Sequence, residues 1–303
     1  MPDPAPVTAP RPHDLRRGAV FVVGAALAFS VMAALIKQLA GPLNNEMLVW
    51  ARNFFSVLFL LPLLIRYKPH QFLTQHWRGH LLRTGAGLTA MYCMFWSIPR
   101  LNLAEAVLLN HTATLFIPFI AWLWLKETVT LRTVVALLIG FVGILLVLKP
   151  GIGVFSWPAV VGLASGVFAA VAMVSIRSMA GIEPTTRIVL YFSVLGTLLS
   201  TVPLAWAWQT PTWWQWLLLA AIGGLAAAGQ LLLTRGYMSA AAAQVGPFTY
   251  SSVLFAALLG WLFWNESLDP RSWYGAGLVV AAGVLLISAR RSGIQPLSSD
   301  SAK

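Results

Sequence analysis

Charge is scarce in this 303-residue sequence. Asp, Glu, Lys and Arg make up only 10% of the residues, whereas 58% are hydrophobic. Soluble globular proteins carry about 25% charged residues, which cover the surface that faces water. The composition therefore excludes a soluble globular protein and predicts a polytopic membrane protein.

Cysteine is also scarce, because Cys93 is the only one. A disulfide framework within the chain and a cysteine-based metal site are thereby excluded. The sequence contains no GxxxxGKS or GxxxxGKT phosphate loop, no HExxH motif and no Asp-rich metal motif. We therefore expect no cofactor, no metal ion and no ATP-hydrolysing domain on this chain.

Acidic residues are few enough to weaken two alternatives. The nine Asp and Glu residues are scattered and form no paired set at one membrane face, which a polytopic membrane enzyme would need. Polar residues within the apolar stretches gather at one depth, whereas a channel needs a continuous polar lining. We therefore favour neither an enzyme nor a channel.

Long apolar stretches are abundant. A bilayer core takes about 20 apolar residues per helix, and Pro, Gly and Asn mark the breaks between such stretches. We therefore predict an all-α integral membrane protein with ten transmembrane helices. The predicted spans are 18–40, 46–66, 80–98, 102–125, 131–149, 157–178, 185–208, 213–236, 240–264 and 272–289.

Two phrases of the sequence recur in register. WLWLKETVTLR (122–132) returns as WLFWNESLDPR (261–271), and IKQLAG (36–41) returns as IRSMAG (176–181). The chain is therefore predicted to be two five-helix repeats, and because five is odd, the second repeat is inverted in the membrane. The predicted divisions are a cytoplasmic tail at 1–17, the first repeat at 18–149, the second repeat at 150–289 and a cytoplasmic tail at 290–303.

The net charge of +11 tests the orientation. With both termini in the cytoplasm, only Lys37, Arg100, Lys149 and Arg271 fall outside, and Arg52 falls within a span. Lys and Arg collect in cytoplasmic loops, so this orientation in a bacterial inner membrane is favoured. The positive net charge is then explained by Lys and Arg in cytoplasmic segments. We expect the lipid bilayer and a small-molecule substrate as partners, with no nucleic acid.

These residues resemble the drug/metabolite transporter superfamily, EamA type. The resemblance rests on 102–147, on 240–287 and on Arg52 in WARNFF, and it covers about residues 15–290. It implies a secondary transporter, not an enzyme, that works by alternating access. Many members carry a Pro opposite Pro118, but Ala257 stands there, so the two halves need not bend alike.

Polar residues lie about nine residues inside the fourth span, near mid-bilayer at about 1.5 Å per residue. A matching set lies in the ninth span. Such polar groups either bind a substrate between the repeats or hydrogen-bond neighbouring helices. We expect the substrate-binding residues to include Asn110, His111, Thr114, Tyr250 and Ser251. His111 is also a candidate protonation site.

Three further residues are candidates for the substrate pocket. Tyr92 and Trp96 are four residues apart, share a helix face and could stack on an aromatic substrate or simply pack. Gln230 is the lone amide of the eighth span. The abundance of aromatic residues in the third and ninth spans resembles the branch that exports aromatic and neutral amino acids.

Arg52 needs an anionic partner because an unpaired charge within a span is costly. We predict an ion pair of Arg52 with Glu105 or Glu46. The functional interpretation is an outer gate or an arginine that binds a substrate carboxylate, and the structural one is a pair that fixes the second helix against the fourth. Glu127 and Glu266 each lie within a repeated phrase, at the end of one predicted helix and just before the next. A carboxylate there is stabilised by helix N–H groups, so both are expected to be structural caps.

The sequence thus predicts a monomer or weak homodimer that exports aromatic or other neutral amino acids. A multidrug carrier, or a carrier of another metabolite such as a nucleoside, S-adenosylmethionine or a sugar phosphate, is the alternative.

Overall fold

The structure is a computed structural model that describes residues 15–64, 74, 76–126, 131–148, 156–179, 183, 185–239 and 246–289. These residues form helices joined by turns, and no strand occurs among them. The helices are α1 (Leu15–Leu39), α2 (Asn45–Leu64), α3 (Trp77–Ser97), η2 (Ile98–Arg100), α4 (Leu103–His111), α5 (Ala113–Leu125), α6 (Leu131–Leu148), α7 (Trp157–Ser178), α8 (Thr185–Ala207), α9 (Trp213–Ser239), η3 (Gly246–Tyr250), α11 (Ser251–Trp264) and α12 (Pro270–Ala289).

The helices confirm the ten predicted spans to within a few residues. Five stretches are long and apolar enough to cross a membrane by themselves: in α1, in α4 with α5, in α7, in α8 and in α9. Shorter apolar helices lie in α6 and in η3 with α11. The remaining spans are α2, α3 and α12, and α3 is less apolar because it carries Arg78, His80 and Arg83.

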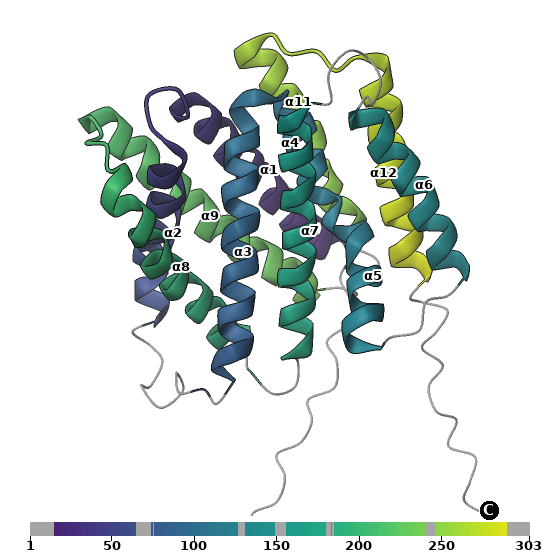
Figure 1. Cartoon of the computed structure of the whole chain (residues 1–303), viewed down its shortest axis with the longest axis horizontal. Coiled ribbons are helices and arrows are strands. Elements are labelled where there is room, and N and C mark those ends of the chain that lie inside the picture. Colours follow the sequence, from purple (N-terminus) through teal and green to yellow (C-terminus); the bar gives the residue numbers. More distant parts are fainter. Residues whose placement is uncertain are drawn as a thin grey trace, which may run out of the picture.

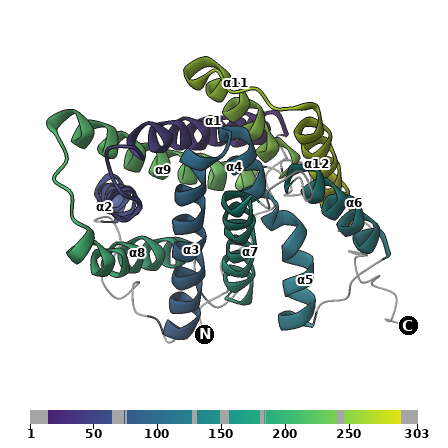
Figure 2. The same ribbon diagram turned by 45° about the horizontal axis from the view of Figure 1, so that its top comes forward.

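The two halves pack on each other as mirror partners. α1 packs on α9 as α7 packs on α3, and α2 packs on α9 as α8 packs on α3. Three helices meet their own counterparts, because α2 contacts α8, α4 contacts α11 and α6 contacts α12. In Figure 1, α2 and α8 lie at one edge of the bundle and α6 and α12 at the other, and Figure 2 shows the same order after rotation. The fold is thus two five-helix repeats around a shared centre.

Glycines set the closest helix contacts. A Cβ added to Gly143 would lie 2.8 Å from the Gly275 carbonyl oxygen, so α6 and α12 cross backbone to backbone. The sequence GLASG (162–166) predicts close packing in the same way, and the structure confirms this. A Cβ on Gly166 would lie 2.6 Å from the Leu109 carbonyl oxygen of α4.

The two copies of the repeated phrase end their helices in the same way. Lys126 ends α5 with φ 57°, and Asn265 ends α11 with φ 53°. Both residues are left-handed helix caps, a conformation that costs a non-glycine residue energy and that ends a helix sharply. The phrase therefore recurs because each half needs the same helix ending.

Candidate functional site

The fourth span is interrupted at Thr112, which keeps right-handed helical angles of φ −60° and ψ −13°. The described part of the ninth span passes at the matching place from a 3-10 helix to an α-helix, and we call both places breaks. α4 ends at His111 and α5 begins at Ala113, while η3 ends at Tyr250 and α11 begins at Ser251. From Leu103 the first break lies about 13 Å along the helix axis, which is near the middle of a bilayer core about 30 Å thick. Pro118 lies within α5 and not at the break. The two breaks lie at matching places of the repeats, and the expectation that the two halves need not bend alike stays a prediction.

Hydroxyl groups stabilise both breaks. The Thr112 hydroxyl donates to the Leu109 carbonyl at 2.5 Å, and the Ser251 hydroxyl donates to the Phe248 carbonyl at 2.6 Å. Side chains that bond a carbonyl three residues back compete with the helix ladder and satisfy groups that the break leaves open. The predicted site residue Ser251 thus holds the break in its own span.

A short contact joins the two breaks directly. His111 Nε2 lies 2.6 Å from the Ser252 hydroxyl oxygen. The same hydroxyl donates to the Thr249 carbonyl at 2.8 Å, and whether His111 or Ser252 is the donor in the contact between them depends on the imidazole tautomer. The two halves are therefore linked by a histidine and a serine at mid-depth.

Further contacts enclose this link. The Tyr250 ring centroid lies 5.7 Å from that of His111, and Tyr250 is buried, with its hydroxyl against Gly283 of α12. Ser30 of α1 donates to the Ser252 carbonyl at 2.9 Å. Residues of α1, α4, η3, α11 and α12 therefore meet at one point. We call its three central residues the break site: His111, Tyr250 and Ser252.

The other predicted pocket residues lie around the break site in different directions. Asn110 faces α7, where its amide lies 3.2 Å from the Ser165 hydroxyl. Thr114 is partly buried two residues after Thr112. Tyr92 packs against the buried core of the bundle, and among the described residues its buried hydroxyl has no hydrogen-bond partner.

Two predicted pocket residues lie in other surroundings. The Arg100 guanidinium covers the Trp96 ring at 3.9 Å and donates to the Trp96 carbonyl at 2.6 Å, so Trp96 belongs to the end of α3. Gln230 is partly buried in α9, next to the contact of Gly229 with Phe29 of α1. Neither surrounding includes a break-site residue.

The predicted ion pair of Arg52 with Glu105 or Glu46 is absent from the described part of the chain. Arg52 Nη1 instead donates to Asn53 Oδ1 at 3.0 Å. Glu105 accepts a hydrogen bond of 2.7 Å from Ser272 of α12. The prediction was wrong because α2 packs toward α8 and α9, whereas the start of α4 faces α11 and α12.

Glu266 binds a different helix from the one expected. Its carboxylate forms an ion pair with Lys37 of α1 and accepts the N–H of Leu103, the first residue of α4, at 2.8 Å. The helix that follows Glu266 is capped by Asp269, which accepts the Ser272 N–H at 2.7 Å. Glu266 therefore caps the opposite half. Glu127, its counterpart in the first repeat, lies outside the described residues.

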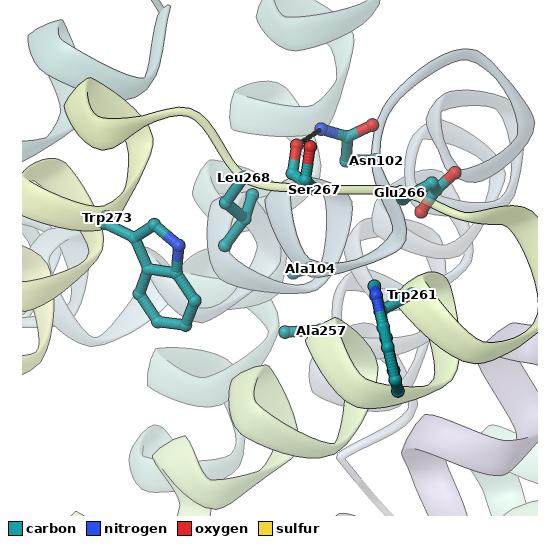
Figure 3. A pocket seen from close by; sticks show the side chains of 8 residues that line it. All are labelled: Asn102, Ala104, Ala257, Trp261, Glu266, Ser267, Leu268 and Trp273. Atoms are coloured by element: carbon teal, nitrogen blue, oxygen red, sulfur yellow. Dashed lines mark hydrogen bonds between the residues drawn. The ribbon is translucent and has the colours of Figure 1, made fainter.

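This cap borders a cavity of about 200 Å³ between the start of α4 and the turn after α11. Figure 3 shows Trp261 and Trp273 on its two sides, with Glu266 at its edge. Asn102 bridges the cavity edge through a 3.4 Å hydrogen bond to the Ser267 carbonyl. The cavity lies at the end of the bundle opposite to the start of α1, which we call the far face.

Sequence reasoning missed two groups of polar residues. Lys37 stands in the repeated phrase IKQLAG, so the repeat could have drawn attention to it, but its partner Glu266 is distant in sequence. Glu183, between α7 and α8, accepts hydrogen bonds from Thr74 and from Arg187, the latter at 2.7 Å. Burial alone would raise the pKa of Glu183, but these hydrogen bonds and the Arg187 charge hold the pKa below its ordinary value.

Comparison with known proteins decides the family. The model of the EamA-like transporter family matches residues 16–149 and again residues 156–289. This chain belongs to the EamA-like transporter family. As an EamA-like transporter it is a multi-pass membrane protein that carries a small molecule across a bilayer.

Relatives of this EamA-like transporter carry several kinds of solute. The chain is 35% identical over 275 residues to the pseudopaline exporter CntI of Pseudomonas aeruginosa (strain UCBPP-PA14), covering 90% of this chain and 96% of that protein. It is 26% identical over 275 residues to the riboflavin transporter of Vibrio cholerae serotype O1, covering 88% and 92%. It is 23% identical over 252 residues to the S-adenosylmethionine uptake transporter of Rickettsia bellii, covering 83% and 86%.

The fold is also present among solved structures. One crystal structure superposes with a TM-score of 0.62 at 18% sequence identity, covering 91% of this chain and 99% of that one. At this identity the likeness concerns the fold alone. The family match and the relatives identify a transporter. The relatives differ in the solute that they carry.

Proposed function

We propose that this EamA-like transporter exports aromatic and other neutral amino acids by alternating access, with the break site as part of its substrate pocket. The observation that supports the proposal is the pair of matching helix breaks, joined by His111 and Ser252. In transporters with inverted repeats, broken helices near mid-depth bind the substrate because their open ends offer backbone polar groups.

The chemistry of the break site suits an amino acid with an aromatic side chain. Tyr250 and Tyr92 are aromatic rings that offer stacking surface and a hydroxyl group. His111 and Asn110 supply hydrogen-bonding groups at the same depth. A ring of the substrate would lie against Tyr250, next to the hydrogen-bonding group of His111.

Pseudopaline is a second candidate cargo. It is favoured by the exporter from Pseudomonas aeruginosa, which is 35% identical to this chain over nearly its whole length. Transport of another metabolite or of a drug is the alternative that the same experiment tests.

Counterflow in proteoliposomes tests the cargo. Purified full-length protein is reconstituted with a high internal load of one compound, and uptake of the same labelled compound is followed. The compounds are phenylalanine, tryptophan, threonine, pseudopaline, riboflavin, S-adenosylmethionine and a cationic drug. Saturable exchange of phenylalanine or tryptophan is expected, and exchange confined to other compounds would overturn the amino-acid assignment.

We further propose that both termini face the cytoplasm of a bacterial inner membrane. The excess of Lys and Arg in the loops on that side supports this orientation. A green fluorescent protein fused after residue 303 is expected to fluoresce, because this protein matures in the cytoplasm. A fused alkaline phosphatase that is active at the same position would overturn the orientation.

A further inference from the structure

Buried polar side chains also gather away from the break site, where α2 and α3 meet α8. We call this group, together with the partly buried Arg83, the arginine cluster: Arg52, Asn53, His80, Arg83 and Thr84. Asn53, His80 and Thr84 are each at most 1% exposed, and Arg52 is 7% exposed. Such burial of polar groups within membrane-spanning helices is costly and marks functional sites.

The cluster carries two positive charges that nothing in the described protein neutralises. The Arg83 guanidinium lies over the Phe192 ring of α8 at 4.1 Å, and Arg52 donates to Asn53 at 3.0 Å. Both arginines are held against neighbouring turns of α8, because Arg83 covers Phe192 while Asn53, which binds Arg52, lies against Gly196. Among the described residues, neither arginine has a carboxylate within ion-pair distance. The described residues therefore supply no negative charge to balance the two arginines.

Several hydrogen bonds in the cluster are also unmade. Arg83 Nε, Thr84 Oγ1 and both ring nitrogens of His80 are buried and have no hydrogen-bond partner among the described residues. The nearest acidic group to His80 is Glu183, whose Oε2 lies 3.8 Å from His80 Nε2 and is already held by Arg187 at 2.7 Å. Donors are therefore in excess of acceptors.

An oxyanion satisfies both deficits at once. Its oxygens accept hydrogen bonds from guanidinium and hydroxyl groups, and its negative charge balances the two arginines. Asn53 helps to fix the geometry, because its amide donates to the Val49 carbonyl at 3.0 Å while its oxygen orients Arg52.

We infer that Arg52, Arg83 and Thr84 bind the carboxylate or phosphate group of the transported solute. The inference rests on the proposed transport function and adds an anion-binding subsite between α2, α3 and α8. The low exposure of Arg52 and Thr84 favours a solute that enters the protein over a lipid headgroup that lies against its surface.

Thermal unfolding of the full-length protein in neutral detergent tests the subsite without relying on transport. Citrate and inorganic phosphate serve as probes, with chloride at the same ionic strength as reference. The wild type is expected to gain a few degrees in Tm with at least one probe, because ligands that bind the folded state stabilise it. Arg83→Gln and Arg52→Gln are expected to abolish the gain.

The anion-free protein gives a second readout. Since Arg83 has no acidic partner, Arg83→Gln is expected to leave the anion-free Tm unchanged or raise it. Arg78→Gln, an exposed change near the start of the same helix, is the matched control and should keep the anion response. Phe192→Leu removes the ring contact but keeps the charge, so it should also keep the response.

Three outcomes would overturn the inference. One is an equal anion gain in the wild type and in both arginine variants. Another is a loss of anion-free Tm in Arg83→Gln, which would indicate a structural role. The third concerns phosphatidylglycerol added to the detergent as a further probe. An Arg83-dependent gain in Tm with this lipid, and none with citrate or phosphate, would assign the arginines to a lipid headgroup.

A transport measurement then separates this inference from the proposed function. For a carboxylate cargo found by counterflow, Arg52→Gln and Arg83→Gln should raise KM at least about tenfold, and exchange of its amide analogue should not depend on the arginines. Exchange that is present but insensitive to both variants would contradict the subsite alone. An absence of exchange with every compound, together with a retained Arg83-dependent anion gain, would contradict only the proposed function.

Discussion

The interface of α3 with α8 and the interface of α9 with α2 are mirror partners, yet one is polar and the other is apolar. The first contains Arg83, Thr84 and His80. In α9 the corresponding stretch is LLLAAIGG (217–224), which has no polar side chain. A repeated fold thus preserves helix packing while the chemistry of each half diverges, so the function must be sought where the halves differ.

The apolar interface is also the tighter one. A Cβ on Gly223 would collide with Phe55 of α2, and the Ser56 hydroxyl donates to the Gly223 carbonyl at 3.1 Å. Gly224 packs against the Phe59 ring. At the polar interface, by contrast, donors remain without acceptors. We infer that the α9–α2 contact contributes rigidity and the α3–α8 contact contributes binding.

The largest effect is expected from breaking the tight interface. Gly223→Val places two methyl groups where the backbone of α2 lies, and overpacking that the backbone must absorb is strongly destabilising. We predict loss of folded, monodisperse protein in size-exclusion chromatography. Gly85→Ala is the control, because a Cβ there meets nothing within 4 Å. Normal yield of Gly223→Val would refute the proposed rigidity of this contact.

A smaller loss is expected at the far face. Glu266→Ala removes the ion pair with Lys37 and the cap of α4, which together stabilise the contact between the halves. Loss of a helix cap costs about 1 kcal/mol, and the unpaired Lys37 adds to this. We predict a lower Tm for Glu266→Ala and a smaller loss for Glu266→Gln. An unchanged Tm in both would show that the contact is not stabilising.

The smallest effect is expected at Glu183 and depends on pH. Because the folded state holds the pKa of Glu183 below its ordinary value, its interactions stabilise the protein at neutral pH. This contribution to the free energy of unfolding is lost as the pH falls from the ordinary pKa of a glutamate to the lower pKa of Glu183 in the folded protein. Glu183→Gln should lower Tm slightly at pH 7, and the difference from wild type should shrink at pH 4. A difference that grows at pH 4 would contradict this sign.

The spans could be predicted from sequence because each needs about 20 apolar residues and ends at Pro, Gly or Asn. The breaks within the fourth and ninth spans could not. The polar residues around His111 indicate a site but do not by themselves predict a helix break, and Pro118 directs attention six residues past Thr112. A break of this kind is stabilised by partners in other helices, such as Ser252, which a single stretch of sequence does not reveal.

The predicted substrate site stays a prediction, although the structure brings some of its residues together and places others elsewhere. His111 and Tyr250 do lie side by side, as equal depth in mirrored spans suggested. Their roles in transport stay predictions. Arg83 was assigned to a cytoplasmic loop because it stands near the start of its helix, although its long side chain reaches the Phe192 ring. Side-chain reach of this kind depends on packing, which the sequence does not specify.

The most direct test of the account is the exchange rate of three variants in the counterflow assay. His111→Gln and Ser252→Ala alter the two residues that join the breaks, while Thr89→Ala alters an exposed hydroxyl on α3. We predict that the first two reduce exchange at least about tenfold at unchanged Tm and that Thr89→Ala exchanges like wild type. Wild-type exchange in both break-site variants would contradict a substrate pocket at the break site.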